Sequence, residues 1–285
     1  MILVTGASGH LGKLIIENLL KKVPPAEVVG LVRDESKAAD LKTKGVDLRI
    51  GDYRDPASMV AAFHGIEKLL LISSSDVTDR LEQHKNAIDV AKKAGVKHIY
   101  YTGVKMKDIN ESPLRPLLED HFRTEDYIRE NGFTYTFLQN TLYYETIPMY
   151  VGERVLETGI YFPAGEGKVA FATRADLAEA AAAVLTGIGH ENKTYGLAGA
   201  ESVSFTDIAH ELSELSGKEV PYNSPVSDEF EASLKQFGLP EGVVQMSVLF
   251  AAGIKNNDFD LPDNTLEQIL QRRPTGLKAF LKDSY

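Results

Sequence analysis

The sequence predicts an α/β protein in which helices flank a doubly wound parallel sheet, followed by a smaller C-terminal α/β lid. A β-branched and apolar run at residues 2–5 leads into a glycine-rich turn and then into an amphipathic segment. Further apolar runs alternate with helix-like segments over short connections. One of them, Lys68–Ile72, carries four consecutive aliphatic residues, as is typical of a central parallel strand buried on both faces.

Local signals place the elements of this fold. Pro24 and Pro25 end the first helix, Gly45 and Gly95 are expected C-caps, and Asp55-Pro56 is an N-cap followed by the first helical residue. Strands are expected at 2–5, 28–32, 46–50, 68–72, 96–102 and 134–139, and helices after the glycine turn and at 35–44, 56–63, 79–94, 117–130 and 175–186.

The rest of the chain is less regular. Residues 140–172 are rich in aromatic residues and are expected to be irregular. Beyond them we expect short strands near 195–197 and 219–222, helices near 206–215, 228–237 and 241–252, and a small helical cap. The pattern predicts a core at residues 1–140, to which residues 168–200 return, and a smaller lid at 141–285.

Composition narrows the class of protein. The chain has 285 residues and a net charge of −10, which argues against sequence-independent binding to nucleic acid. It contains no cysteine, and its seven histidines lack ligand-like spacing, so neither disulfides nor a metal site are expected. No apolar run approaches membrane-spanning length and no leader precedes the first strand, so we expect a cytoplasmic protein. Either a monomer or a homodimer is expected, and the sequence does not decide between them.

The turn Thr5-Gly-Ala-Ser-Gly-His-Leu-Gly12 carries the first functional prediction. Gly6 permits a sharp turn off the strand, Gly9 lets the backbone approach a pyrophosphate, and Gly12 lets the helix pack closely. A strand, a glycine turn and a helix aim a helix N-terminus at a phosphate, so the turn predicts a dinucleotide at the carboxyl ends of the first and fourth strands. The alternative is an ordinary glycine-rich turn between a strand and a helix.

Residues at the ends of the second and third strands refine the cofactor. Arg33 stands where an acidic residue would select NAD, so it favours the 2′-phosphate of NADPH, with NADH as an alternative because Asp34 is adjacent. Lys37 could add to this contact, whereas Arg33 as a solvated surface charge is the competing interpretation. Asp52 either reaches the adenine amine or caps the following helix.

Further residues at or near the strand ends are candidates for contact with the cofactor or substrate. Ser73, Ser74 and Ser75 either line the cofactor ribose or form a routine loop entry. Asn140 either holds the nicotinamide amide or a substrate oxygen, or serves the local turn. His121 is a candidate proton donor, and the alternative is a surface or capping residue. The aromatic residues at 143–171 are either a stacking wall for an acceptor or core of the lid.

Tyr101-x-x-x-Lys105 matches the spacing of the tyrosine–lysine acid pair of many reductases, but that pair works from one helical face. Here Tyr101 belongs to an expected strand, and the helix at 117–130 carries no such pair. Reduction of a simple ketone would need that acid, whereas a quinone or a cationic dye accepts hydride without it. The sequence therefore favours electron-poor aromatic acceptors.

These motifs resemble those of the NmrA-like atypical short-chain dehydrogenases/reductases. More specifically, they resemble bacterial type 2 NAD(P)H:quinone oxidoreductases and triphenylmethane reductases. The matching stretches are residues 5–12, 32–33, 51–53, 68–75, 94–99, 121–125, 136–143 and 172–176. The resemblance implies a Rossmann-type fold, a quinone-like acceptor facing Tyr143, and cofactor contacts from Gly6, Ala7, Ser8, Gly9, His10, Leu11, Arg33, Ser73, Ser74, Ser75, Asn140, Phe171, Ala172, Thr173, Arg174, Ala175 and Asp176.

The chain departs from this family pattern at several points. Gln139 stands where Arg is common, and Asp34 stands where Asn is usual. The stretch Gln271–Pro274 lacks a family glycine, and the loop at 104–116 is longer than in the quinone reductases. Because this loop borders the expected acceptor site, substrate identity transfers least well.

Two functions fit the resemblance, and a third fits poorly. The first is an NADPH-dependent reductase of quinones or related aromatic acceptors. The second is an NmrA-type redox sensor that binds the dinucleotide and acts through a protein partner. A sugar-nucleotide epimerase or dehydratase would need the missing tyrosine–lysine pair.

Overall fold

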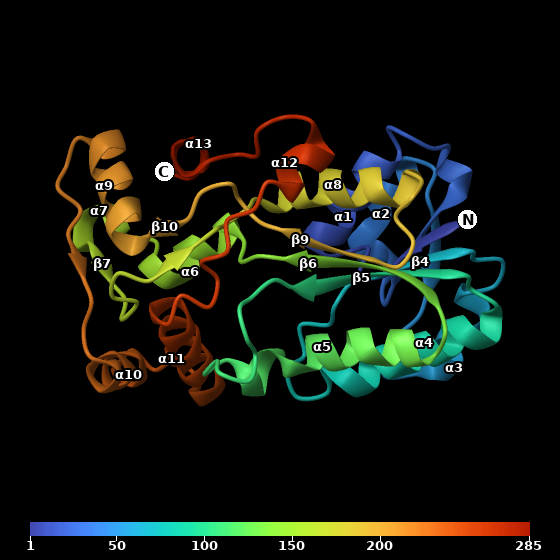
Figure 1. Ribbon diagram of the computed structural model, residues 1–285, viewed down its shortest axis with the longest axis horizontal. Coiled ribbons are helices and arrows are strands. Elements are labelled where there is room, and N and C mark those ends of the chain that lie inside the picture. The colour runs from blue at the N-terminus through green and yellow to red at the C-terminus, as the bar shows by residue number, and fades with distance from the viewer. The chain divides into compact units, whose positions relative to one another are not determined.

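A seven-stranded sheet in the order β3-β2-β1-β4-β5-β6-β9 organises the first part of the structure, a computed structural model that describes residues 1–285 (Figure 1). Every neighbouring pair from β3 to β6 is parallel, and β9 completes the sheet beside β6. The order reverses between β1 and β4, which confirms the predicted doubly wound fold. The strands are β1 (Ile2–Val4), β2 (Val28–Val32), β3 (Asp47–Ile50), β4 (Lys68–Leu71), β5 (His98–Val104), β6 (Thr134–Asn140) and β9 (Lys193–Leu197).

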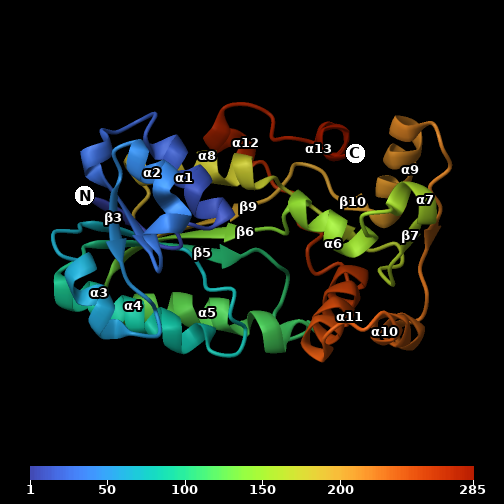
Figure 2. The same ribbon diagram turned by 180° about the vertical axis from the view of Figure 1, so that it is seen from behind.

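Helices cover both faces of this sheet (Figures 1 and 2). Helices α1 (His10–Leu19) and α8 (Arg174–Thr186) pack against each other on one face. Helices α3 (Pro56–Ala62), α4 (Arg80–Ala94) and α5 (Arg115–Glu130) lie on the other. The link from β2 to β3 holds the 3-10 turn η2 (Glu35–Ala38) and α2 (Ala39–Thr43), and another 3-10 turn, η1 (Pro25–Glu27), precedes β2.

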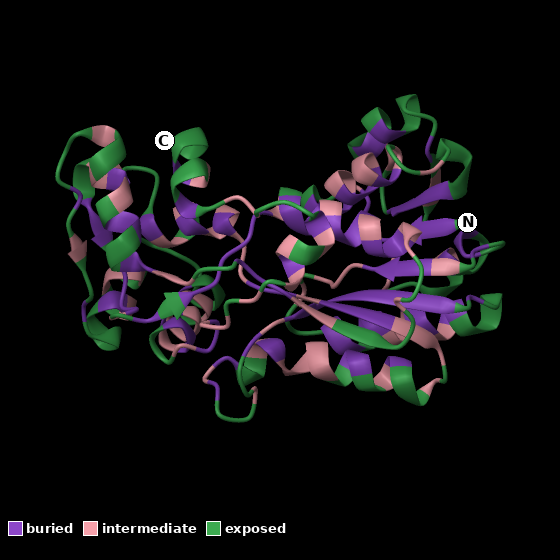
Figure 3. Ribbon diagram, turned by 45° about the horizontal axis from the view of Figure 1, so that its top comes forward, coloured by how far each residue is buried: buried purple, intermediate pink, exposed green.

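The central strands of the sheet are buried because their side chains are largely apolar (Figure 3). Leu69, Leu70 and Leu71 of β4 are all fully buried, as the uninterrupted apolar run predicts. Tyr101 of β5 and Phe137 of β6 belong to one core cluster with residues of α3 and α4. The strongly apolar centre holds the strand ends in register, and these ends carry the polar residues of the site.

Several element boundaries differ from the prediction. The helix expected at 35–44 is divided into η2 and α2, since the Asp34 side chain caps the first segment and Ala38 leaves helical geometry. The strand expected at 96–102 runs from His98 to Val104. Helix α5 begins at Arg115 because Pro116 is well tolerated in a first helical turn.

The chain divides into two units. The first unit comprises Met1–Val104, Asp120–Asn140 and Arg174–Gly196, and the second comprises Lys105–Glu119, Thr141–Thr173 and Leu197–Tyr285. The connection after β5 thus belongs to the second unit, and α8 with most of β9 belongs to the first. No helix of the chain combines the length and the apolar character that a membrane span needs.

Short strands and helices build the second unit. Residues 140–172 are more regular than expected, because β7 and β8 pair with strands from beyond residue 200. The helices are α6 (Ile147–Val151), α7 (Val155–Thr158), α9 (Phe205–Ser216), α10 (Ser227–Gln236), α11 (Glu241–Lys255), α12 (Thr265–Leu270) and α13 (Leu277–Ser284), with the 3-10 turn η3 (Tyr144–Thr146). The strands are β7 (Ile160–Tyr161), β8 (Lys168–Val169), β10 (Val203–Ser204) and β11 (Tyr222–Asn223).

Aromatic residues form much of the core of the second unit. Phe162 is 1% exposed, and its ring centroid lies 4.7 Å from that of Phe205. Phe171 is equally buried and stacks on Tyr144 at 5.3 Å. For these side chains, the core interpretation holds and the stacking wall is not needed.

The long loop after β5 is fixed within the second unit. Lys105 Nζ lies 2.8 Å from the Asp263 carboxylate, and the Lys107 backbone N–H donates to the Asp258 carbonyl oxygen at 2.8 Å. The buried Asp258 carboxylate accepts a hydrogen bond of 2.5 Å from the Ser112 hydroxyl. These contacts make the loop an ordered part of the unit.

Candidate functional site

The glycine turn between β1 and α1 has the geometry that the sequence predicts for Gly6 and Gly12. Gly6 has φ +59°, a left-handed conformation that favours glycine. A Cβ on Gly12 would lie 2.3 Å from the Gly6 carbonyl oxygen, so the helix can approach the turn only without a side chain there. Gly9 is the N-cap of α1 and provides no side-chain hydrogen bond. The first backbone N–H groups of α1 therefore remain available to an anion.

A cleft of about 590 Å³ opens beside this turn, at the carboxyl ends of β1, β2, β3 and β4. This is the place where open parallel sheets bind their ligands. The cleft brings together eight of the predicted cofactor residues, which are Gly6, Ser8, Gly9, Arg33, Asp52, Ser73, Ser74 and Ser75. Ala7 is fully buried beneath the turn, Leu11 faces the core, and His10 is exposed in the first turn of α1.

Arg33 is an exposed residue in the wall of the cleft, directly after β2. The neighbouring Asp34 carboxylate accepts hydrogen bonds from the Ser36 backbone N–H at 2.9 Å and the Ser36 hydroxyl at 2.7 Å. These bonds lower the pKa of Asp34 and commit its carboxylate to capping η2. Asp34 is not part of the cleft wall, so its charge does not line the space beside Arg33.

Asp52 and Tyr53 form the floor of the cleft after β3. Asp52 accepts a hydrogen bond from the Arg54 backbone N–H at 3.0 Å, whereas Asp55 is the N-cap of α3. The alternative in which Asp52 caps that helix is therefore wrong. The Tyr53 hydroxyl lies 2.9 Å from the Ile72 carbonyl oxygen and within hydrogen-bonding distance of Thr5 Oγ1, and burial raises the pKa of Tyr53.

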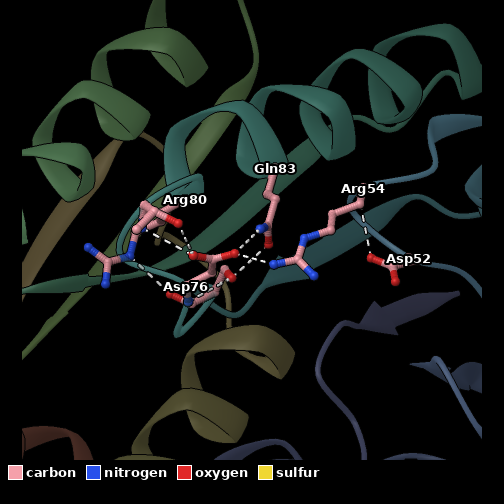
Figure 4. A network of polar contacts seen from close by, with 7 residues as sticks. Asp52, Arg54, Asp76, Arg80 and Gln83 are labelled. Carbon is pink, nitrogen blue, oxygen red and sulfur yellow. Dashed lines mark hydrogen bonds and ion pairs between the residues drawn. The ribbon is translucent and has the colours of Figure 1, made fainter. Parts of the chain in front are cut away.

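A network of polar contacts joins several residues that line the cleft (Figure 4). The Asp76 carboxylate pairs with Arg54 and accepts a hydrogen bond from Gln83 Nε2 at 2.9 Å. Bonds from Thr78 and Arg54 hold the pKa of Asp76 well below its usual range. The Ser74 hydroxyl donates to Gln83 Oε1 at 2.7 Å, so the serine loop is positioned by α4.

The buried His84 anchors the same loop from α4. The Ser74 backbone N–H donates to His84 Nε2 at 2.9 Å, and His84 Nδ1 lies 2.8 Å from Thr124 Oγ1. Because Nε2 accepts, Nδ1 carries the proton and donates it to Thr124, whose own hydroxyl donates to the Asp120 carbonyl oxygen. Burial and the nearby Arg80 lower the pKa of His84 to about 3, so the ring is neutral.

Tyr101 and His121 form a second pair near the serine loop. The Tyr101 hydroxyl lies 2.9 Å from His121 Nδ1. Burial raises the pKa of Tyr101 and, with the positive charge of Arg80, lowers the pKa of His121 well below 6.5. Lys105 is paired with Asp263 in the second unit.

Gln139, which stands where the family commonly has arginine, forms a hydrogen bond with a buried carboxylate. Gln139 Nε2 donates to the Glu125 carboxylate at 2.9 Å, and Arg129 lies 3.5 Å from the same group. Glu125 is 3% exposed, and burial raises its pKa. An amide therefore supports a buried carboxyl group where the resemblance leads one to expect an arginine.

The remaining predicted residues lie in different parts of the chain. Asn140, the last residue of β6, is 5% exposed, and its side-chain amide forms no hydrogen bond to another protein group. Tyr143 forms an isolated parallel bridge with Ala172 in the second unit. Phe171 and Thr173 are buried in that unit, whereas Arg174, Ala175 and Asp176 form the first turn of α8 in the first unit.

Sequence reasoning missed several residues of the cleft wall. Tyr53, Arg54, Asp76, Thr78 and Gln83 all line the cleft. Tyr53 and Arg54 follow Asp52 directly, so their place after a strand end was a usable signal. Nothing in the local sequence indicates that Asp76 and Gln83 would meet Arg54, because their contact depends on the order of the strands.

Comparison with known proteins identifies the family. A model of the NmrA-like family matches residues 1–280. The chain belongs to the NmrA-like family. Among its relatives, quinone oxidoreductase 2 of Escherichia coli is 42% identical over 278 residues, which cover 97% of this chain and 96% of that protein. The NAD(P)H azoreductase of Xenophilus azovorans is 32% identical over 88% of this chain and 86% of that protein.

Solved structures of NmrA-like relatives share the fold. The E. coli quinone oxidoreductase 2 complexed with NADPH superposes with a TM-score of 0.92 at 39% identity, covering 100% of this chain and 99% of that one. The Citrobacter sp. triphenylmethane reductase complexed with NADP(H) gives a TM-score of 0.93 at 39% identity, and both chains are covered completely.

The residues of this NmrA-like chain fit such a dinucleotide. The turn at Gly6–Gly9 exposes backbone where phosphates would lie, and Arg33 provides positive charge at the end of β2. Asn140, a polar residue with 5% exposure, ends β6 at the carboxyl edge of the same sheet.

Proposed function

We propose that this chain is an NADPH-dependent reductase that transfers hydride to a quinone or a similar electron-poor aromatic acceptor. The observation that carries the proposal is the cleft with its glycine turn and Arg33, in a chain 42% identical to a quinone oxidoreductase. NADPH would supply the hydride when bound. The residues of this chain would bind the cofactor and orient it and the acceptor for hydride transfer.

The adenosine end of the cofactor belongs in the cleft of the first unit. The N–H groups of the turn and of the first residues of α1 would hold the pyrophosphate. Arg33 would bind the 2′-phosphate, and this supports NADPH over NADH because Asp34 is engaged with Ser36. Asp52 would face the adenine amine, and Ser73–Ser75 the ribose.

The nicotinamide end and the acceptor would lie further along the carboxyl edge of the sheet. Asn140, at the end of β6, would hold the carboxamide of the nicotinamide with its side-chain amide. Tyr143 is the residue proposed to face the acceptor. Lys105 is bound to Asp263, so acceptors that need no tyrosine–lysine acid are favoured.

A steady-state assay tests the reaction. Purified protein is mixed with NADPH or NADH and with a panel of quinones, azo dyes and triphenylmethane dyes, and the loss of reduced cofactor is followed by absorbance. We expect turnover with NADPH and at least one acceptor class. Tight NADPH binding without turnover across the panel would refute the reductase and favour a redox sensor that acts through a protein partner.

The Arg33→Ala variant tests the cofactor assignment. Loss of a charge-assisted contact to phosphate should weaken NADPH binding by about 10-fold or more, since such bonds contribute about 1.5–3 kcal/mol. The affinity for NADH should change much less. Lys21→Ala, at an exposed position outside the cleft, is the matched control. An equal loss of affinity for both cofactors would show that Arg33 does not read the 2′-phosphate.

A further inference from the structure

The hydrogen bond between Tyr101 and His121 bears on which nitrogen of the imidazole carries the proton. Tyr101 is fully buried, and its hydroxyl lies 2.9 Å from Nδ1 of His121. A phenol O–H is a strong donor, and an unprotonated imidazole nitrogen is a strong acceptor. If Nδ1 carried the proton instead, the Tyr101 hydroxyl would have to turn its hydrogen from His121 toward Ser73 or Thr124, which also interact with it.

The other nitrogen of His121 has no partner in the protein. Nε2 forms no hydrogen bond to any protein group, and the residue is partly exposed. His84 provides the contrast within the same unit, because both of its nitrogens are bonded, to Ser74 and to Thr124. His84 is therefore held as the Nδ1–H tautomer, whereas one ring nitrogen of His121 has no partner in the protein.

His121 and Tyr101 lie close to the loop that lines the cleft. Tyr101 is paired in register with Leu71 of β4, and the serine loop that lines the cleft begins two residues later. The Ser73 backbone N–H donates to Thr102 Oγ1 at 2.9 Å, which ties this loop to β5. The Tyr101–His121 pair thus lies next to the wall of the cleft, at the carboxyl edge of the sheet.

The surroundings of the ring keep it neutral. Burial lowers the pKa of His121, and the positive charge of Arg80 acts in the same direction. The buried Arg80 donates from Nε to the Ser74 carbonyl oxygen at 2.9 Å, so its place beside the pair is fixed. A neutral imidazole that is both oriented and protonated on Nε2 is suited to polarise a carbonyl group, as in other enzymes that use a neutral histidine as an electrophile.

We propose that Tyr101 locks His121 as the Nε2–H tautomer and that this N–H donates a hydrogen bond to a carbonyl oxygen of the quinone acceptor. This inference rests on the proposed function. When hydride adds to the quinone, negative charge develops on that oxygen, and the N–H stabilises it. The proton stays on Nε2, and the reduced oxygen takes its own proton from water. Tyr101 is then a positioning residue and His121 a catalytic one.

Nitrogen NMR of protein labelled with ¹⁵N-histidine tests the tautomer without any turnover. We expect His121 in the Nε2–H form and His84 in the Nδ1–H form, each assigned by its own glutamine variant. Tyr101→Phe should release His121 into a mixture of tautomers and leave His84 unchanged. Tyr100→Phe is the matched control, since it removes the hydroxyl of the adjacent buried tyrosine, which alternates to the other face of β5.

The same spectra test the ligand contact. A dead-end mixture of NADP⁺ and menadione should shift the Nε2 resonance of His121 and not that of His84. In the turnover assay, His121→Leu should lower kcat for menadione about 100-fold, the loss typical of one oxyanion donor, with NADPH affinity unchanged. His121→Gln, which keeps an N–H near this position, should recover part of the rate.

The outcomes separate this inference from the proposed function. If the protein reduces no quinone, the proposed function fails and the quinone contact fails with it. If the protein reduces menadione but His121 is in the Nδ1–H form, the inference is overturned. Equal kcat values for wild type, His121→Leu and His121→Gln would overturn it as well.

Discussion

His84 should make the protein sensitive to mild acid. Folding lowers the pKa of His84 to about 3, from about 6.5 in an unfolded chain. Between these values, the unfolded chain binds a proton that the folded protein does not, so the free energy of unfolding falls as pH falls through this window. Each pKa unit corresponds to about 1.4 kcal/mol, so the loss between pH 7 and pH 5 is about 2 kcal/mol.

The assay compares wild type with His84→Gln at both pH values by urea unfolding, followed by circular dichroism. The variant keeps an acceptor for the Ser74 N–H but cannot titrate, so its loss between pH 7 and pH 5 should be smaller by about 2 kcal/mol. His64→Gln, at an exposed position, is the control. Equal losses in wild type and His84→Gln would refute the buried neutral ring and its hydrogen bond to Ser74.

Three further substitutions test other parts of the first unit. Gly12→Ala should lower the free energy of unfolding, measured in urea, by about 1–3 kcal/mol, because the new Cβ would meet the Gly6 carbonyl oxygen. Gly242→Ala is the control: a Cβ at Gly242 has no atom within 4 Å, so this variant should not be destabilised. Asp55→Ala removes the N-cap of α3 and should cost about 1 kcal/mol in the same measurement; no loss would contradict the cap. Because burial raises the pKa of Glu125, the contribution of this side chain to stability should fall as pH rises above 4.5. In urea unfolding at several pH values, stability should therefore rise more with pH in Glu125→Gln than in wild type, and parallel profiles would contradict the raised pKa.

The core of the fold was predictable because its signals are local. The glycine spacing around Gly6 and Gly12 and the apolar run of β4 each act within a few residues, and both have the predicted geometry. Asp55 as the N-cap of α3 followed from its place before Pro56. The strand-order reversal beside β1 then located the cleft from general rules of parallel sheets.

The parts that escaped prediction depend on contacts between distant segments. Arg54 and Asp76 meet only because β3 and β4 end at the same edge of the sheet. The two-residue strands β7 and β8 have no periodicity of their own, and they form by pairing with β11 and β10. The tautomer of His84 follows from the single hydrogen bond that its Nε2 accepts from Ser74, which no spacing of residues reveals.

The path of the chain through its two units constrains how the protein is made. The first unit is assembled from three separate segments, the last of which ends at Gly196. A nascent chain on a ribosome therefore lacks α8 and the edge strand β9 until two thirds of the polypeptide has emerged, and the apolar face of α1 that packs on α8 stays uncovered until then. The nascent chain should therefore be most prone to aggregate, and should most need chaperones, before that point. A fragment that ends at Asn140 should be insoluble.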